Sequence, residues 1–331
     1  MFDVITVGGA VVDFFIKTHP EIITIDNRKV LHREELIAYP VGSKILIDSV
    51  NKNFGGGAFN AAVSFSHLGL KTGFLGCLGR DSNGVSILHR MGEEKIEFLG
   101  HFSDVENGFS IILDSYDEER TILTFRGSND LFDFNKVDKS KLKTRWFYIS
   151  SFTKAGFKSF KKLVDFAVRN EVKLAFNPST YLAKMGFERL RKIITNLDIL
   201  VLNRVEAEFI SNEKFVKNML LWLKDYVRRV VVVTDGKNGA FAFDGELFYR
   251  VRVPKVRVRE TTGAGDAFSS TFVYGMMKRD DVVFSLKAAM LNSMSVVSHL
   301  GAQNILLSES ELLRSLTRKR IVVRSSKSFI D

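Results

Sequence analysis

The stretch Glu260-Thr261-Thr262-Gly263-Ala264-Gly265-Asp266 joins a predicted strand to a predicted helix, as in an α/β fold. Valines alternate with basic residues before it, and Ala267–Arg279 has the apolar side and the basic end of a helix. Glycines at such a junction let the backbone approach an anion closely, and the first turn of the helix leaves N–H groups unpaired. Asp266 would lie inside this anion site, where a carboxylate can accept a proton from a hydroxyl. The stretch therefore predicts phosphoryl-transfer chemistry.

Apolar strand-like runs alternate with amphipathic helical patterns through most of the 331 residues. Ile199–Leu202 and Val230–Thr234 are continuous runs of this kind, and Ala58–Leu68 and Ala155–Arg169 have helical spacing. Such alternation favours an α/β fold with a mostly parallel sheet covered by helices on both faces. We expect a single domain over residues 1–331 with its ligands at the carboxyl ends of the strands.

Two segments interrupt this alternation. Phe14–Asn53 lacks helical periodicity and contains the β-rich pieces Ile22–Ile25 and Lys44–Asp48, and residues 109–126 read as an antiparallel hairpin. Together, over about residues 14–53 and 107–128, they predict a small β-sheet beside the main body. A lid over a ligand site and an ordinary edge hairpin are both open interpretations.

Composition narrows the class of protein. The single cysteine, Cys77, excludes disulfides within the chain, and a reducing, cytoplasmic location follows as an expectation. The N-terminus reads as a strand, and no apolar run approaches the ~20 residues that span a bilayer. The net charge of +10 is compatible with nucleic-acid binding, but no zinc-finger or RNP-like pattern accompanies it, so an enzyme that handles polyanions is favoured.

Glycine-rich turns follow the first predicted strand and precede the first predicted helix. Gly8-Gly9 leads to Asp13, but neither GxGxxG nor a P-loop is present. In Phe54–Ala62, the three glycines Gly55, Gly56 and Gly57 permit close backbone contact with a ligand, and the amide of Asn60 can both donate to and accept from sugar hydroxyls. Each turn alone is equally well explained as structural.

Two further motifs follow apolar strands. Asn203-Arg204-Val205-Glu206 has the spacing of a helix capping box, and the same oxygens could support Mg²⁺ near a phosphate. Thr234-Asp235-Gly236 opens a polar glycine turn where a nucleotide could lie, although Asn238-Gly239 also fits a hairpin turn.

In this order, the motifs resemble the ribokinase-like (PfkB) family of carbohydrate and nucleoside kinases over essentially the whole chain. Further segments match the family pattern: Gly76–Gly84, Arg126–Asn129, Asn177-Pro178 and Gly301-Ala302. Each match is weak alone, and six or more in register are specific. The resemblance implies a Rossmann-like three-layer αβα core with a β lid, an ATP-dependent transfer to a hydroxymethyl group of a sugar, and Mg²⁺ bridging the phosphates.

The resemblance also implies roles for individual residues. Asp266 would be the base, with the backbone N–H groups of Gly263, Ala264 and Gly265 stabilising the transferred phosphoryl group. The acceptor would be bound by Asp13, Gly55, Gly56 and Asn60. ATP would be bound by Asn203, Thr234, Gly236, Thr262, Asn292 and Gly301. Mg²⁺ would be held by Asn203 and Glu206, largely through water.

Departures from the family pattern and open choices remain. Glu260 stands where Asp is common, near a monovalent-cation site, which puts K⁺ dependence in doubt, and Thr271 replaces a small residue in the helix after Asp266. A sugar acceptor is favoured over a nucleoside because no aromatic clamp for a base is evident, although Phe14, Phe15 and Phe109 could provide one. An acceptor that already carries phosphate, a catalytically idle sugar- or nucleotide-binding protein, and a homodimer formed through the lid are further expectations.

Overall fold

The computed structural model describes most of the chain, in seven segments: residues 1–18, 21–27, 32–114, 120–150, 156–254, 261–299 and 301–330. The predicted strand just before the Gly263–Gly265 turn, with Val256, Val258 and Glu260, lies outside these segments.

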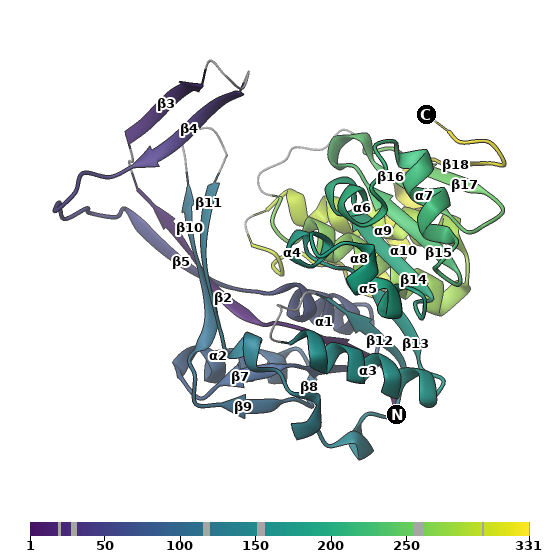
Figure 1. Cartoon of the computed structure of the whole chain (residues 1–331), viewed down its shortest axis with the longest axis horizontal. Helices are drawn as coiled ribbons and strands as arrows, with labels where there is room; N and C mark the ends of the chain where they lie inside the picture. The colour runs from purple at the N-terminus through teal and green to yellow at the C-terminus, as the bar shows by residue number, and fades with distance from the viewer. Residues whose placement is uncertain are drawn as a thin grey trace.

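A central ten-stranded sheet runs through the body (Figure 1). Its strands, in spatial order, are β18 (Val323–Ser326), β17 (Phe248–Val251), β16 (Ala240–Phe243), β15 (Val230–Thr234), β14 (Ile199–Asn203), β13 (Lys173–Phe176), β12 (Thr144–Ile149), β1 (Phe2–Val7), β6 (Thr72–Leu75) and β8 (Glu97–Phe98). Neighbours from β15 to β8 pair in parallel, and β15 to β18 pair antiparallel. The prediction of a mostly parallel sheet is confirmed.

Helices cover both faces of the central sheet because alternate strand side chains point to opposite sides. Ile5 and Phe147 belong to one apolar core, and Val4 and Tyr148 belong to the other. The first core is covered by α3 (Phe157–Arg169), α4 (Thr180–Ala183), α5 (Phe187–Ile194), α6 (Arg204–Ser211) and α7 (Val216–Lys224). The second is covered by α1 (Gly57–His67), α8 (Ala264–Arg279), α9 (Val282–Val297) and α10 (Glu309–Arg318). The αβα arrangement is therefore as expected.

A separate four-stranded sheet, called the small sheet below, projects from the body (Figure 1). It consists of β11 (Arg120–Gly127), β10 (Asn107–Asp114), β2 (Val11–Lys17) and β5 (Ser49–Gly55), in that order. Its base packs near α2 (Ser82–Glu93) in a third apolar cluster. Two further strand pairs are β3 (Glu21–Asn27) with β4 (His32–Ala38) and β7 (Cys77–Gly79) with β9 (His101–Ser103).

Short 3₁₀ turns complete the fold, at Ser128–Leu131, Phe134–Lys136, Lys139–Lys141 and Gly236–Asn238. Within the segments that the structure describes, no helix combines the length and the apolar character needed to cross a bilayer.

Three local predictions need correction. Lys44–Asp48 is not a strand, because β5 begins only at Ser49, opposite Lys17, which is the last residue of β2. The sequence Ile321-Val322-Val323 reads as an edge strand, but the C-terminal edge strand is Val323–Ser326. Asp13 lies within β2, so a strand rather than a tight turn presents it.

Candidate active site

The candidate site lies where the parallel strands end and α8 begins. Asn203 and Thr234 are paired at the last positions of β14 and β15. Gly263 caps α8, so its first turn carries Ala264, Gly265 and Asp266. The carboxyl ends of parallel strands and the start of a helix are where an α/β fold binds anionic ligands.

The carboxylate of Asp266, in the first turn of α8, contacts residues at the start of α1. Its Oδ2 accepts a hydrogen bond of 2.8 Å from Nδ2 of Asn60 in α1. Its Oδ1 lies close to Gly57, where an added Cβ would be 3.1 Å away and would also collide with Oγ of Ser150. Burial raises the pKa of Asp266, and the Asn60 hydrogen bond works against that rise. Asp266 is thus an oriented carboxylate whose affinity for a proton is increased.

The turn before α8 has the geometry of an anion site. Gly263 has φ 79°, and an added Cβ there would lie 2.7 Å from Cα of Ala302. At Gly265 an added Cβ would meet no atom within 4 Å, so space is open beside the helix start. The N–H of Ala264 donates to the Thr261 carbonyl at 3.2 Å, and within the described residues the N–H groups of Gly263 and Gly265 have no acceptor. Those two N–H groups are therefore available to an anion.

The predicted acceptor residues connect the small sheet to this turn. Asp13 is 7% exposed, and a Cβ at Gly55 would collide with its carboxylate. Gly56 caps α1 with φ 95°, and a Cβ there would lie 2.9 Å from Cα of Ala10. Asn60 is 5% exposed. A side chain at position 55 would displace the Asp13 carboxylate, and only glycine fits at position 56, against the backbone of Gly9 and Ala10.

The capping box at Asn203 and Glu206 is present. Oδ1 of Asn203 accepts from the Glu206 N–H at 2.9 Å, and Oε2 of Glu206 accepts from the Asn203 N–H at 3.0 Å. Oγ1 of Thr180 donates to the other Glu206 oxygen at 3.2 Å. Burial raises the pKa of Glu206 to about 7, against hydrogen bonds from Asn203 and Thr180, and the nearby charge of Asp266 adds to the rise.

These contacts decide how the residues fit a metal ion. The Asn203 and Glu206 oxygens already accept hydrogen bonds from the protein, and across the described segments no cluster of three or more His, Cys, Asp or Glu residues could hold a metal. They fit a role that acts through metal-bound water.

The remaining predicted ATP residues fall into two groups. Thr234 is half-buried, Gly236 has φ 49° with open space at its Cα, and Thr262 lies in the turn before α8. Gly301, with φ 90°, precedes Ala302, which packs on Gly263. Thr234 is the last residue of β15, and the other three residues stand on turns.

Asn292 is different, and its predicted contact with ATP needs correction. Its side chain in α9 has 0% exposure. Nδ2 donates to Oγ1 of Thr271 at 2.7 Å, and Oδ1 accepts from the Leu307 N–H at 2.9 Å. A fully buried amide with these partners cannot line the adenine. The hydrogen bond between Asn292 and Thr271 joins α9 to α8, which gives a structural reason for the threonine at position 271.

Similarity to known proteins identifies the family of this chain. A model of the pfkB family of carbohydrate kinases matches residues 24–309. The chain belongs to this family. It is therefore a kinase that transfers phosphoryl groups to alcohol acceptors.

The relatives of this kinase differ in their acceptors. It is 24% identical over 311 residues to the ATP-dependent 6-phosphofructokinase of Thermoanaerobacterium thermosaccharolyticum, covering 91% of this chain and 89% of the relative. The fold is similar to that of a Methanocaldococcus jannaschii nucleoside kinase, with TM-score 0.77, 20% identity and 96% and 99% of the two chains covered. It is also similar to a putative ribokinase II from E. coli in complex with ATP and Mg²⁺, with TM-score 0.80, 17% identity and coverage of 96% and 100%.

The sequence did not predict the contacts of three residues in this candidate site. Gly57 lies between Asp266 and Ser150, and Gln303 donates from Nε2 to Oδ1 of Asn60 at 3.0 Å. Gly57 was the third glycine of a recognised run, so a signal for it existed. Gln303 follows the matched Gly301-Ala302 pair, but nothing local points from it to Asn60.

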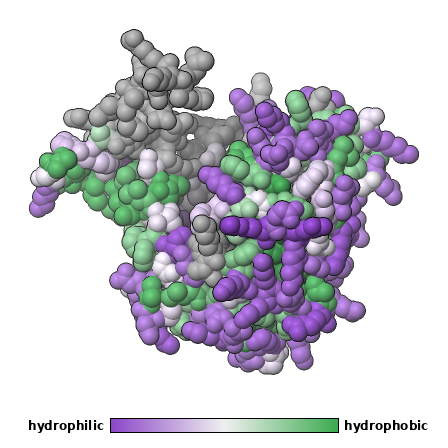
Figure 2. All heavy atoms as spheres, viewed as in Figure 1, coloured by the Kyte–Doolittle hydropathy of each residue, from purple (hydrophilic) through white to green (hydrophobic). Residues whose placement is uncertain are grey.

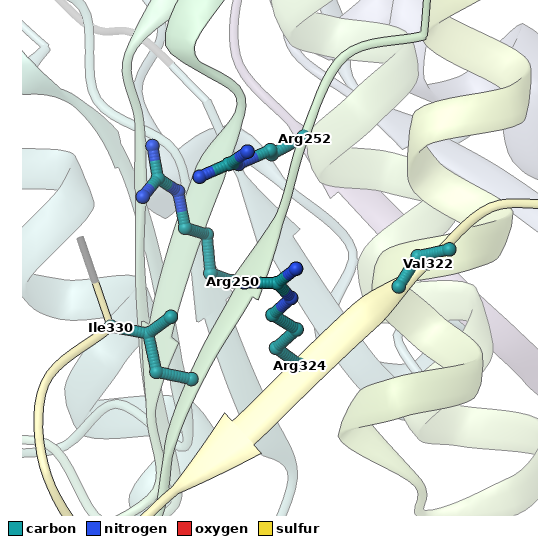
Figure 3. A pocket seen from close by; sticks show the side chains of 5 residues that line it. All are labelled: Arg250, Arg252, Val322, Arg324 and Ile330. Carbon is teal, nitrogen blue, oxygen red and sulfur yellow. The ribbon is translucent and has the colours of Figure 1, made fainter.

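A small cavity of about 160 Å³ lies elsewhere on the kinase, between β17, β18 and the C-terminal segment (Figure 3). It is lined by Arg250, Arg252, Val322, Arg324 and Ile330 and contains none of the predicted site residues. Within the described segments, Arg252 and Arg324 make no ion pair. The cavity is therefore separate from the candidate active site.

Proposed function

We propose that this protein transfers the γ-phosphoryl group of ATP to a hydroxymethyl group of a sugar. The observation that carries the proposal is the carboxylate of Asp266, held by Asn60 beside the open N–H groups at the start of α8. A carboxylate placed beside an anion site can take the proton of an attacking hydroxyl.

The residues would divide the work as follows. Asp266 accepts the proton of the acceptor hydroxyl, and the raised pKa of its carboxyl favours that acceptance. The N–H groups of Gly263 and Gly265 stabilise the negative charge on the transferred group. Ala264 contributes less than its neighbours, because its N–H already donates to Thr261. Asp13, Gly55, Gly56 and Asn60 bind the acceptor where the small sheet meets α1.

ATP would extend over the ends of β14 and β15. Thr234, Gly236, Thr262 and Gly301 present their turns there, and Asn203 and Glu206 support metal-bound water. Mg²⁺ would neutralise phosphate charge during transfer. The E. coli protein of the same fold contains ATP and Mg²⁺, which supports this choice of cofactor. Potassium dependence turns on Glu260, which is outside the described residues.

The register of the small sheet favours a sugar over a nucleoside. Asp13 pairs with Asn53 and Ser110, so all three lie on one face. A Cβ at Gly301 would lie 3.4 Å from Cγ of Asn53, and this proximity to a proposed ATP residue supports the polar face as the acceptor side. Phe14 and Phe109 lie on the opposite face, pack against each other at 6.3 Å and join the third apolar cluster. Two of the three residues that could have formed an aromatic clamp therefore point away.

An acceptor panel tests the proposal. We would measure ADP release with sugars, sugar phosphates and nucleosides, with and without the Asp266→Asn substitution. A sugar or sugar phosphate should give the highest kcat/KM, and Asp266→Asn should reduce kcat by about 10²–10⁴-fold while ATP binding is kept. Near-normal turnover in Asp266→Asn would remove the assigned base.

The same panel separates the alternatives. A nucleoside as best acceptor would assign the second family activity. Ligand binding without ADP release for any acceptor would instead favour a catalytically idle binding protein.

The small sheet is also the candidate surface for a homodimer. Its outer strands expose Val50, Ile122, Leu123 and Phe125, each by 42–52%. Figure 2 shows hydrophobic atoms gathered on this side of the molecule, in contrast to the mostly hydrophilic body. Apolar exposure of this kind is typical of a surface that another chain covers.

A cytoplasmic location stays a prediction from cysteine content.

A further inference from the structure

A chain of three side chains leads from the connection after α9 to Asp266. Nε2 of Gln303 donates to Oδ1 of Asn60 at 3.0 Å, and Nδ2 of Asn60 donates to Oδ2 of Asp266 at 2.8 Å. The three residues come from the α9–α10 connection, from α1 and from α8. Gln303 is separated from Asn60 by 243 positions in the sequence, so only the tertiary fold brings them together.

The direction of these hydrogen bonds follows from chemistry. An ionised carboxylate only accepts hydrogen bonds, so Asn60 must turn its NH₂ group toward Asp266. The carbonyl oxygen of Asn60 then points the opposite way and needs a donor. The NH₂ group of Gln303 is that donor. Each amide in the chain therefore fixes the orientation of the next one.

Burial makes this orientation costly to change. Gln303 is 6% exposed and Asn60 is 5% exposed, so water does not readily replace either partner. If the Asn60 amide turned over, its oxygen would face the Asp266 carboxylate and its NH₂ group would face another NH₂ group. Both contacts would be repulsive, and buried polar groups left without partners are unfavourable.

The connection that carries Gln303 is itself held at both ends. Ala302 packs so closely on the Gly263 turn that a Cβ at Gly263 would be 2.7 Å from its Cα. At the other end, the Leu307 N–H donates to the buried Asn292 side chain at 2.9 Å. Gln303 thus stands on a fixed segment that also contacts the proposed anion site.

From these contacts we infer that Gln303 is a positioning residue for the phosphoryl transfer: it holds the Asn60 amide in the orientation that presents its NH₂ group to the base. This inference rests on the proposed role of Asp266. Gln303 acts through Asn60.

The main test is a double-mutant cycle of Gln303→Leu with Asn60→Ala. Alone, Gln303→Leu should lower kcat by about tenfold and leave the KM for ATP within about twofold. The acidic limb of its kcat/KM profile should move upward by ~0.5–1 pH unit, because a poorly held Asn60 no longer lowers the pKa of Asp266. In the Asn60→Ala protein, adding Gln303→Leu should change kcat less than about twofold. Additive losses in the double variant would overturn the inference.

A matched control uses the next residue, Asn304, whose side chain is exposed. Asn304→Leu should leave the pH profile unchanged, and an equal shift in this variant would assign the effect to the segment rather than to Gln303.

A second readout does not depend on turnover. Carbon-13 NMR of labelled aspartate, with the Asp266 signal assigned by its loss in Asp266→Asn, should show a higher Asp266 pKa in Gln303→Leu. An unchanged pKa would contradict the inference. If Asp266→Asn keeps its activity, the proposed function fails, whereas the NMR titration still decides whether Gln303 orients Asn60.

Discussion

The central sheet and the small sheet both carry parts of the candidate site, but they differ in what covers them. Side chains of the central sheet such as Val4, Ile5 and Val232 have 0% exposure, because helices pack on both faces. In the small sheet, residues 121–125 of β11 and 49–52 of β5 are exposed. The base is thus fixed by a close-packed core, whereas Asp13 and Gly55 stand on a sheet whose outer strands are partly exposed. We therefore expect the small sheet to have a lower local stability than the central sheet.

Gly263→Ala should have the largest effect, because it disturbs the close-packed part of the site beside the central sheet. A left-handed φ costs a non-glycine residue about 1–2 kcal/mol, and the new Cβ would also collide with Ala302. We expect a lower unfolding temperature and a loss of kcat greater than about 100-fold, measured by calorimetry and ADP release.

Gly265→Ala is its matched control, because its Cβ meets open space. Its stability should match or exceed that of the wild type, since alanine is better than glycine within a helix by roughly 1 kcal/mol. Equal destabilisation by both substitutions would show that the packing against Ala302 does not fix this turn.

The buried carboxyl of Glu206, at the end of the central sheet, should make the free energy of unfolding depend on pH. Its pKa of about 7 in the folded protein is above its ordinary value of 4.5, so the folded state binds the proton more tightly. The resulting stabilisation is present below pH 4.5 and is lost as the pH rises through 7. Between pH 5 and 8, urea unfolding should show a loss of about 3 kcal/mol that is absent in Glu206→Gln. Parallel pH curves for the two proteins would exclude this charge effect.

Asp13→Asn should test the acceptor side. The substitution keeps the shape of the side chain but removes a charge-assisted contact with a hydroxyl, so the acceptor kcat/KM should fall by about 10–100-fold. The KM for ATP should stay within about twofold, because ATP would lie over β14 and β15. Initial-rate measurements with each substrate varied give both constants. Equal changes in both would mean that the small sheet does not bind the acceptor separately.

The smallest effect is expected for Leu123→Ser on the exposed small sheet. Leu123 is 52% exposed, so unfolding of the isolated chain should change by less than about 0.5 kcal/mol. If this surface joins two copies, the same substitution should shift light scattering toward monomer. An unchanged oligomeric state would place any interface elsewhere.

Several features of the site were predictable because their signals are local. The Asn203–Glu206 capping box needs only the spacing of two residues after a strand, and it is present. The Gly263–Asp266 turn likewise needs only small residues before a helix. The antiparallel hairpin of β10 and β11 was also predicted, because alternating side chains mark both strands.

Other features had no local signal. Asn292 matched the family position for an adenine contact, yet its side chain is buried against Thr271. The faces of the small sheet were also undetermined, because a one-residue change of register would exchange Phe14 with Asp13.

The sequence by itself determined the alternating αβα core, the turn before α8 and the carboxylate at its start, because periodicity and glycine placement act over a few residues. Only the tertiary structure decided what holds that carboxylate. Asn60 and Asp266 are 206 positions apart, and Gln303 joins them from a third segment. Side chains reach hydrogen-bonding distance through the packing of α1, α8 and the α9–α10 connection, and no pattern within any one of these segments records the contact.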